Sequence, residues 1–403
     1  MTLAAETTVQ SDRAVRRRAL QLSLATALAG ANASVLYATA SIIGSVLAPA
    51  PWLATAPLTA LVIGMAFGTL PIGALARRYG RRTALLTGAS AGVISGLASA
   101  AAVYLGLFSL LCLGTFFGGV YAAASQSYRF AATDGAAPAL QPRLISWVLA
   151  GGVAAAFVGP QLVQHTKDFW PQHLFAATYL GQAGVAALAM IVLAGVSTPP
   201  ASGAGEQAAR PLGEIVRKPD FIVAALCGTV SYALMNLIMT SAPLAMKMCG
   251  HSIADSTTGI QWHVLGMYAP SFFTGSLIAR FGAPRVTAFG LALEVAAAAV
   301  DLAGVSVGHF WAGLILLGIG WNFGFIGASA LVVACHRPAE KTRVQSFNDF
   351  IVFGTMAVGS FSSGQMLATG GWAMVNWTVF PLALLALAAL GARALRAPPQ
   401  AMP

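Results

Sequence analysis

The sequence predicts an all-α membrane protein with twelve transmembrane helices, arranged as two six-helix bundles that repeat one another. The 403 residues are 57% hydrophobic and only 8% charged, which is typical of a polytopic membrane protein. The apolar stretches are each close to the ~20 residues that a helix needs to cross a bilayer. Short motifs also recur at an offset of about 200 residues, half the length of the chain.

The first apolar stretch, from residue 20 to about 48, follows a polar segment that carries four arginines. It is longer than the core of a signal peptide, so we expect it to remain as the first membrane span. Eleven further spans are expected near 53–76, 83–105, 108–131, 144–164, 174–196, 221–246, 257–281, 285–307, 309–335, 344–369 and 372–395.

The repeat divides the chain into two halves. Residues 73–82, after the second span, are echoed by residues 275–284 after the eighth. A stretch rich in Pro, Gly and Ala at 197–219 is predicted to be a cytoplasmic linker. The bundles then comprise residues 1–196 and 220–403. Such a duplication builds two bundles that rock about a substrate site near the middle of the membrane.

The basic residues predict the orientation. Twenty of the 22 Lys and Arg lie on the same side as the N-terminus on this map, and only Lys167 and Lys247 lie opposite. The positive-inside rule therefore places both termini in the cytoplasm, and the chain in a bacterial-type inner membrane as a multi-pass protein. The net charge of +10 reflects this topology, so it does not require a nucleic-acid partner.

Two pairs of soft side chains lie on the seventh and eighth predicted spans. Met235 and Met239 are spaced i, i+4, and so are His263 and Met267, which puts each pair on one helix face. In an antiparallel hairpin, Met235 lies level with Met267. Met239 likewise lies level with His263. Thioether and imidazole ligands together suit copper, and thioethers favour Cu(I). Helix packing is an equally good explanation on spacing alone, because Met often fills gaps between helices.

The four cysteines show neither zinc spacing nor a disulfide framework. Cys227 lies two turns from Met235 and is either a buried small hydrophobe or a thiol that receives the ion. Cys249 lies beside the outer loop. It either has a metal-capture or redox role or has no functional role there.

Three carboxylates fall within predicted spans. Asp349, near the inner end of the eleventh span, indicates either proton coupling or a salt bridge to an inner arginine such as Arg343. Glu294 and Asp301 share a face of the ninth span at i, i+7, and we favour a structural pairing for them. Asn236 neighbours the methionines and either lines a cavity or joins two helices by hydrogen bonds.

Residues 73–82 resemble the loop signature of the major facilitator superfamily, and the resemblance in architecture covers the whole chain. Arg77 stands where that family carries an acidic residue. The charge latch that the resemblance implies for this loop, which also contains Arg81, is therefore altered. The arginine of the drug–proton antiporters is replaced by Leu113, Gly114 and Thr115, which counts against a drug exporter.

A narrower resemblance joins the paired motifs of the seventh and eighth spans with both thiols. Together they are similar to the CcoA-like copper importers. The resemblance implies copper uptake that supplies assembly of a cbb3-type cytochrome c oxidase, with copper as the transported substrate and no resident cofactor. The residues that it implies as ligands are Met235, Met239, His263 and Met267, with Cys227 and Cys249 as further thiols.

Two alternatives stay open beside copper import. One is a secondary exporter of small organic molecules, in which the methionines form an adaptable apolar wall. The other is a membrane copper sensor or receptor that binds without transport. The sequence contains no nucleotide-binding, nucleophile or acid–base constellation, so we do not expect an enzyme. The expected partners are the copper ion and the lipid bilayer, and no copper chaperone is identified.

Overall fold

The computed structural model describes residues 12–134, 140–197, 210–337 and 340–396. Within these ranges the chain is helical, including the 3-10 turn η1 (Pro51–Leu53), and has no strand. The helices of the first half are α1 (Asp12–Leu47), α2 (Ala56–Tyr79), α3 (Arg81–Leu105), α4 (Phe108–Ser125), α5 (Tyr128–Thr133), α6 (Gln141–Thr166) and α7 (Ala176–Ala194). Those of the second half are α8 (Leu212–Val216), α9 (Pro219–Met248), α10 (Ile253–Tyr268), α11 (Ser271–Phe281), α12 (Ala283–Ala303), α13 (Val307–Ala334), α14 (Lys341–Trp377) and α15 (Val379–Arg396).

The predicted membrane spans are all present as helices. Ten described helical stretches are long and apolar enough to cross a bilayer. One of them, Arg343–Leu395, has 53 residues and is turned back at Gly371, where φ is 68°, so it holds two crossings. The twelfth crossing is made by α10 and α11 in succession. The predicted fold class is therefore confirmed.

Some element boundaries differ from those expected. The first helix begins at Asp12, so the arginines before residue 20 are helical and do not belong to a polar tail. The eighth span is interrupted between α10 and α11 at Pro270, which has no N–H to donate to the preceding turn. Helix α10 starts at Ile253 because Ser252 and Asp255 form a capping box there.

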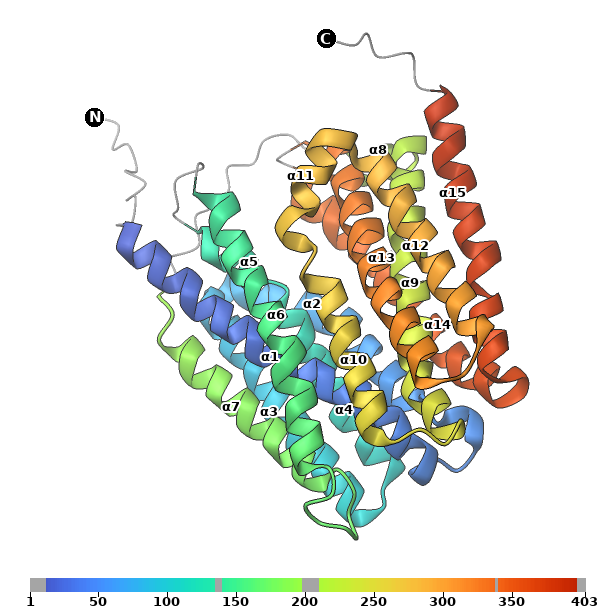
Figure 1. Ribbon diagram of the computed structural model, residues 1–403. Helices are drawn as coiled ribbons and strands as arrows, with labels where there is room; N and C mark the ends of the chain where they lie inside the picture. The colour runs from blue at the N-terminus through green and yellow to red at the C-terminus, as the bar shows by residue number, and fades with distance from the viewer. Residues whose placement is uncertain (1–11, 135–139, 198–209, 338–339, 397–403) are drawn as a thin grey trace.

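The helices gather into two groups (Figure 1). In one group α1 packs on α6, α2 on α4 and α3 on α7, and in the other α12 packs on α13 and α9 on α14. We call the side where α1 begins and α15 ends the terminal side. The side of the turn between α9 and α10 is the hairpin side. The two groups diverge toward the terminal side and come together toward the hairpin side.

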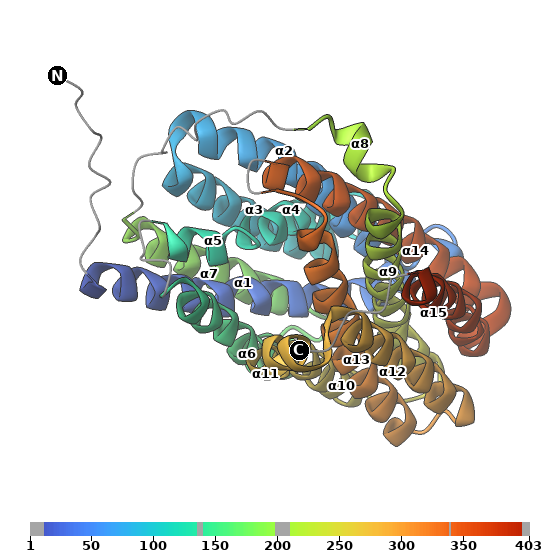
Figure 2. The same ribbon diagram turned by 90° about the horizontal axis from the view of Figure 1, so that it is seen from above.

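The contacts between the groups join α2 to α14, α6 to α10 and α1 to α9, and Figure 2 shows the first two pairs side by side. Near the hairpin side, Thr55 donates a hydrogen bond to the carbonyl oxygen of Ser360 at 3.2 Å. Gln164 donates to the Thr258 hydroxyl at 3.2 Å. The ring of Trp52 also packs edge-on against Phe361. The structure is therefore closed on the hairpin side.

Candidate transport site

An aromatic cluster lies around Tyr232, near the middle of α9. Its ring is T-shaped to Trp321 at 5.2 Å and to Phe325 at 4.8 Å, and Phe353 of α14 lies at 6.2 Å. Trp321 and Phe325 share one face of α13 because they are spaced i, i+4, and their rings stack at 5.5 Å. We call these four residues the aromatic cluster.

One member of the aromatic cluster has an unsatisfied hydrogen-bond donor. Trp321 is only 8% exposed, and its indole N–H has no hydrogen-bond partner among the described residues. A buried indole N–H normally finds an acceptor, so this donor is a candidate for contact with a ligand.

Polar groups from both helix groups surround the aromatic cluster. The Tyr37 hydroxyl on α1 donates to the side-chain oxygen of Asn236 on α9 at 3.1 Å. The Asn236 amide in turn donates to the carbonyl oxygen of Met356 on α14 at 3.4 Å. Asn236 therefore both joins α9 to α14 and connects the two groups, which is the hydrogen-bonding role of the two that the sequence left open.

Charged residues also approach the aromatic cluster from both sides. Arg129 of α5 interacts electrostatically with Asp349 of α14, with Tyr268 of α10 and with Tyr232. Asp349 therefore interacts with an arginine of the other helix group. The two expected roles, proton coupling and a salt bridge to Arg343 or another inner arginine, stay predictions. Arg129 and Asp349 place opposite charges on the two groups beside the aromatic rings.

A glycine lets the two groups approach closely at this level. A Cβ added to Gly152 on α6 would lie 2.6 to 3.0 Å from ring atoms of Tyr268 on α10. Real Cβ atoms essentially never come that close, so any larger residue would push α6 away from α10.

The combined arrangement suits a flat aromatic ligand with a polar edge. Ligand sites are mostly apolar, with a few placed polar groups that fix orientation. Here aromatic faces come from α9, α13 and α14, while hydroxyl, amide, guanidinium and carboxylate groups come from both helix groups. A molecule bound among them would contact both groups at once, as transport by rocking bundles requires.

The four residues predicted as copper ligands are all buried: Met235, Met239, His263 and Met267. One ring nitrogen of His263, Nδ1, lies 2.8 Å from the carbonyl oxygen of Leu314 on α13, and the other, Nε2, has no protein partner. Helix α10 packs mainly on α13 and α6, with fewer contacts to α9. The described residues contain no cluster of three or more His, Cys, Asp or Glu that would hold a metal, a criterion that leaves thioethers aside. The copper site stays a prediction.

The two thiols occupy different surroundings. Cys249 is exposed at the end of α9 on the hairpin side. Cys227 is buried, and its Sγ lies 3.7 Å from the carbonyl oxygen of Ala386 on α15. Helix α15 lies on the far side of the second helix group from α10 (Figure 1). Cys227 thus packs against α15 on the side away from α10, and its role as a thiol that receives the ion stays a prediction.

The motif at 73–82 forms the junction between α2 and α3. The side chain of Arg77 lies outside the described part, so its predicted gating role stays a prediction. Arg81 forms an ion pair with Asp134 at 3.0 Å, and Arg18 donates to the backbone carbonyl oxygen of Asp134. Burial raises the pKa of the Asp134 carboxyl, and the two arginines oppose that rise. An acidic partner is therefore supplied from beyond α5 instead of from the motif itself.

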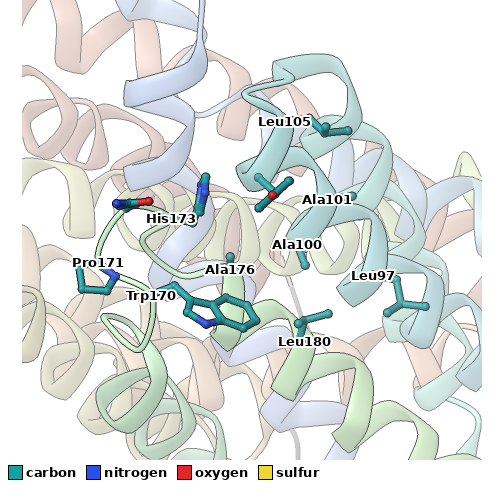
Figure 3. Close-up of a pocket in the computed structure, with 11 residues that line it drawn as sticks. Leu97, Ala100, Ala101, Leu105, Trp170, Pro171, His173, Ala176 and Leu180 are labelled. Carbon is teal, nitrogen blue, oxygen red and sulfur yellow. The ribbon is translucent and has the colours of Figure 1, made fainter.

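A separate hollow of about 770 Å³ opens at the hairpin-side ends of α3 and α7 (Figure 3). Leu97, Ala100 and Leu180 line its apolar part, and Trp170 and His173 lie on the loop before α7. None of its lining residues belongs to the aromatic cluster or to the groups around it, so the hollow is not the candidate site.

The aromatic cluster is not among the residues that the sequence predicts for the site. The signal was the pair Trp321 and Phe325, whose i, i+4 spacing puts two large rings on one face of a span. Arg129 was counted only as a basic residue on the N-terminal side, although a predicted span included it.

The fold and the site define a membrane transport protein, and the chain belongs to the major facilitator superfamily. The family model described as Major Facilitator Superfamily matches residues 22–267. Among curated proteins, the chain is similar to the riboflavin transporter RfnT of Brucella anthropi, with 47% identity over 380 residues, 94% of this chain and 96% of the relative. It is 26% identical over 353 residues to the uncharacterized MFS-type transporter YddS of Bacillus subtilis, covering 82% and 80% of the two chains.

Solved structures support the same fold. A partially occluded inward-open conformation of the xylose transporter XylE from E. coli has a TM-score of 0.74 at 15% identity, covering 97% of this chain and all of that one. A D-xylose-proton symporter has a TM-score of 0.75 at 16% identity, covering 93% and 97%. At these identities the likeness shows the fold alone. None of these relatives is named as a copper importer, so the resemblance to the CcoA-like importers is not supported.

Proposed function

We propose that this protein carries riboflavin, or a flavin with the same ring system, across the membrane. The observation that carries the proposal is the 47% identity to a riboflavin transporter across 94% of the chain. This favours the alternative of a small organic substrate over copper. It leaves the direction of transport to experiment.

The chemistry of the aromatic cluster supports a flavin. The isoalloxazine ring is flat and fused, with an apolar dimethylbenzene end and a pyrimidine-dione edge that both donates and accepts hydrogen bonds. Tyr232, Trp321 and Phe325 offer ring faces and edges for stacking. The free indole N–H of Trp321 and the amide of Asn236 offer hydrogen bonds to the polar edge.

The contacts between the helix groups are suited to opening and closing. On the hairpin side they include neutral hydrogen bonds, such as Thr55 to Ser360 and Gln164 to Thr258, and one from the Lys247 ammonium to the Ser45 hydroxyl at 3.3 Å. A neutral bond contributes only ~0.5–1.5 kcal/mol net, and one to a charged group about 1.5–3 kcal/mol. The free energy that separates the closed and open arrangements can therefore be supplied by a bound substrate that contacts both groups.

The copper hypothesis makes a different forecast. If the buried thioethers and His263 carry copper, Ag(I) should compete with transport, because soft ligands prefer these ions, and an excess of Mn²⁺ should not. If the protein carries a flavin, neither ion should compete, whereas unlabelled riboflavin should. A sensor or receptor would bind its ligand without moving it.

Cells that cannot make riboflavin provide the test. We expect expression of the chain to change the accumulation of radiolabelled riboflavin, upward for an importer and downward for an exporter, with no change in radioactive copper. Cells with the empty vector are the control. Unchanged riboflavin together with raised copper, suppressed by Ag(I), would return the assignment to copper import.

A further inference from the structure

Two buried carboxyl groups lie in the groove between α12 and α13. Glu294 is 0% exposed and Asp301 is 2% exposed. Their spacing of seven residues puts both on the same face of α12, about 10 Å apart along the helix axis. Asp301 is the nearer of the two to the hairpin side, where α12 ends.

Glu294 is tied to the helix that carries Tyr232. One of its carboxyl oxygens accepts a hydrogen bond from the Ser231 hydroxyl of α9 at 2.6 Å, and the other has no partner. Glycines make room for this side chain on α13. A Cβ at Gly320 would lie 2.9 Å from the Glu294 Cγ, and one at Gly324 would lie 2.5 Å from the Ser231 hydroxyl.

Asp301 continues the same line toward the hairpin side. Neither of its carboxyl oxygens has a hydrogen-bond partner within the described ranges, and a Cβ at Gly313 of α13 would overlap them. His309 stands one turn before Gly313 on α13, half-buried at the end of the groove, with Nδ1 2.8 Å from the Ser306 hydroxyl. The groove therefore holds three titratable groups in order from the hairpin side: His309, Asp301 and Glu294.

No basic side chain pairs with either carboxyl in the described ranges. Arg393 of α15 pairs with Asp220, Arg280 of α11 lies over the Phe281 ring, and Asp349 of α14 interacts with Arg129. The other charged or titratable side chains that the structure describes on helices packed against α12 are Cys227, Tyr232 and Lys247 on α9, His309 on α13 and Arg343 on α14. None of these makes a described hydrogen bond or ion pair with Glu294 or Asp301.

An unpaired carboxylate at membrane depth is strongly disfavoured. Both carboxyl groups therefore hold their protons in this conformation. Release of the Glu294 proton breaks only its O–H bond, gives the proton to water and leaves a carboxylate. That carboxylate would strengthen the hydrogen bond from Ser231, directly beside Tyr232 of the aromatic cluster.

We propose that Glu294 is a proton-binding site that couples transport to proton movement, with Asp301 as a second proton site toward the hairpin side. The coupling runs through Ser231 to α9, the helix that also bears Tyr232 and the Asn236 link to α1. The identity of the cargo rests on the proposed function. The proton site itself does not depend on which substrate is carried.

The test uses the purified full chain in lipid vesicles, with Glu294→Gln as the variant. Glutamine keeps the shape and an acceptor for Ser231 but cannot release a proton. Glu214→Gln, at an exposed position on α8, is the matched control. We expect a gradient of one pH unit to sustain roughly tenfold riboflavin accumulation for wild type and Glu214→Gln, the ratio expected for one proton per flavin. We expect none for Glu294→Gln, which keeps riboflavin exchange without a gradient. Asp301→Asn should reduce the gradient-driven accumulation.

Infrared spectroscopy of the same proteins reports the proton directly. We expect C=O stretching absorption from both buried protonated carboxyls in wild type at neutral pH. Glu294→Gln should lose the part due to Glu294 and keep the part due to Asp301. Gradient-driven accumulation by Glu294→Gln equal to wild type would overturn the proposal, and so would an unchanged band. If Glu294→Gln also loses exchange, the infrared band alone decides. If wild type moves no riboflavin, the proposed cargo is wrong, and the band still decides whether Glu294 holds a proton.

Discussion

Replacing Trp321 by Leu tests the aromatic cluster most sharply. Leucine keeps an apolar side chain between Tyr232 and α13 but removes the ring face and the indole N–H. Stacking of a flat heterocycle on an aromatic side chain contributes ~1–3 kcal/mol. Since 1.4 kcal/mol is a factor of ten, we expect the KM for riboflavin to rise by about 5- to 150-fold.

The control for this variant is Trp377→Leu. Trp377 is 62% exposed, compared with 8% for Trp321, and it lies at the end of α14, away from the aromatic cluster. Substitutions at such surface positions usually change free energies by less than ~0.5 kcal/mol, so the control should stay within about twofold of wild type. Both variants are compared at equal membrane abundance and equal elution on gel filtration. A Trp321→Leu protein that is normally inserted and keeps the wild-type KM would refute the placement of the flavin against these rings.

Three further outcomes are expected. Gly152→Val should reduce turnover strongly, because its Cβ would meet a tyrosine ring on α10. Gly184→Val should not reduce turnover, because an added Cβ there has no atom of a neighbouring helix within 4 Å. Normal turnover of Gly152→Val would contradict the close approach of α6 and α10. Cys249, which is exposed, should react with a membrane-impermeant maleimide much faster than the buried Cys227. Equal reaction rates would show that the described burial of Cys227 on α9 is wrong. Tyr37→Phe removes a hydrogen bond between α1 and α9 that contributes ~0.5–1.5 kcal/mol. Spin-label distances should therefore show about a two- to tenfold larger population that is open on the hairpin side. An unchanged population would argue against this hydrogen bond as a link between the groups.

Much of the fold was predictable because each membrane span is recorded in a continuous apolar run. The hairpin of α9 and α10 was predicted because its polar turn separates two such runs. The break at Pro270 was not, since its flanking residues remain apolar and hydropathy does not register a missing N–H. Hydropathy likewise does not register the break between α4 and α5, so the sequence predicts a single span at 108–131.

The candidate site was harder to predict because it depends on which faces of the helices meet. Met235 and His263 were predicted as ligands because each is spaced i, i+4 from a methionine. Such spacing shows only which residues share a helix face. Tyr232 and Trp321 lie on different helices, α9 and α13, with almost 90 residues between them, and only the packing of these helices brings their rings together. The structural pairing favoured for Glu294 rests on the peripheral place of the ninth span in the superfamily, and its contact with α9 follows only from packing.

The most direct measurement for the central claim is riboflavin exchange by the purified protein. Vesicles that contain the protein are loaded with unlabelled riboflavin, and the entry of a trace of radiolabelled riboflavin is followed without any ion gradient. We predict rapid entry that is absent from protein-free vesicles, is blocked by excess unlabelled riboflavin and is unaffected by xylose, Ag(I) or Mn²⁺. Entry no faster than in protein-free vesicles, from protein that elutes as a single folded species, would contradict the assignment of this chain as a flavin transporter.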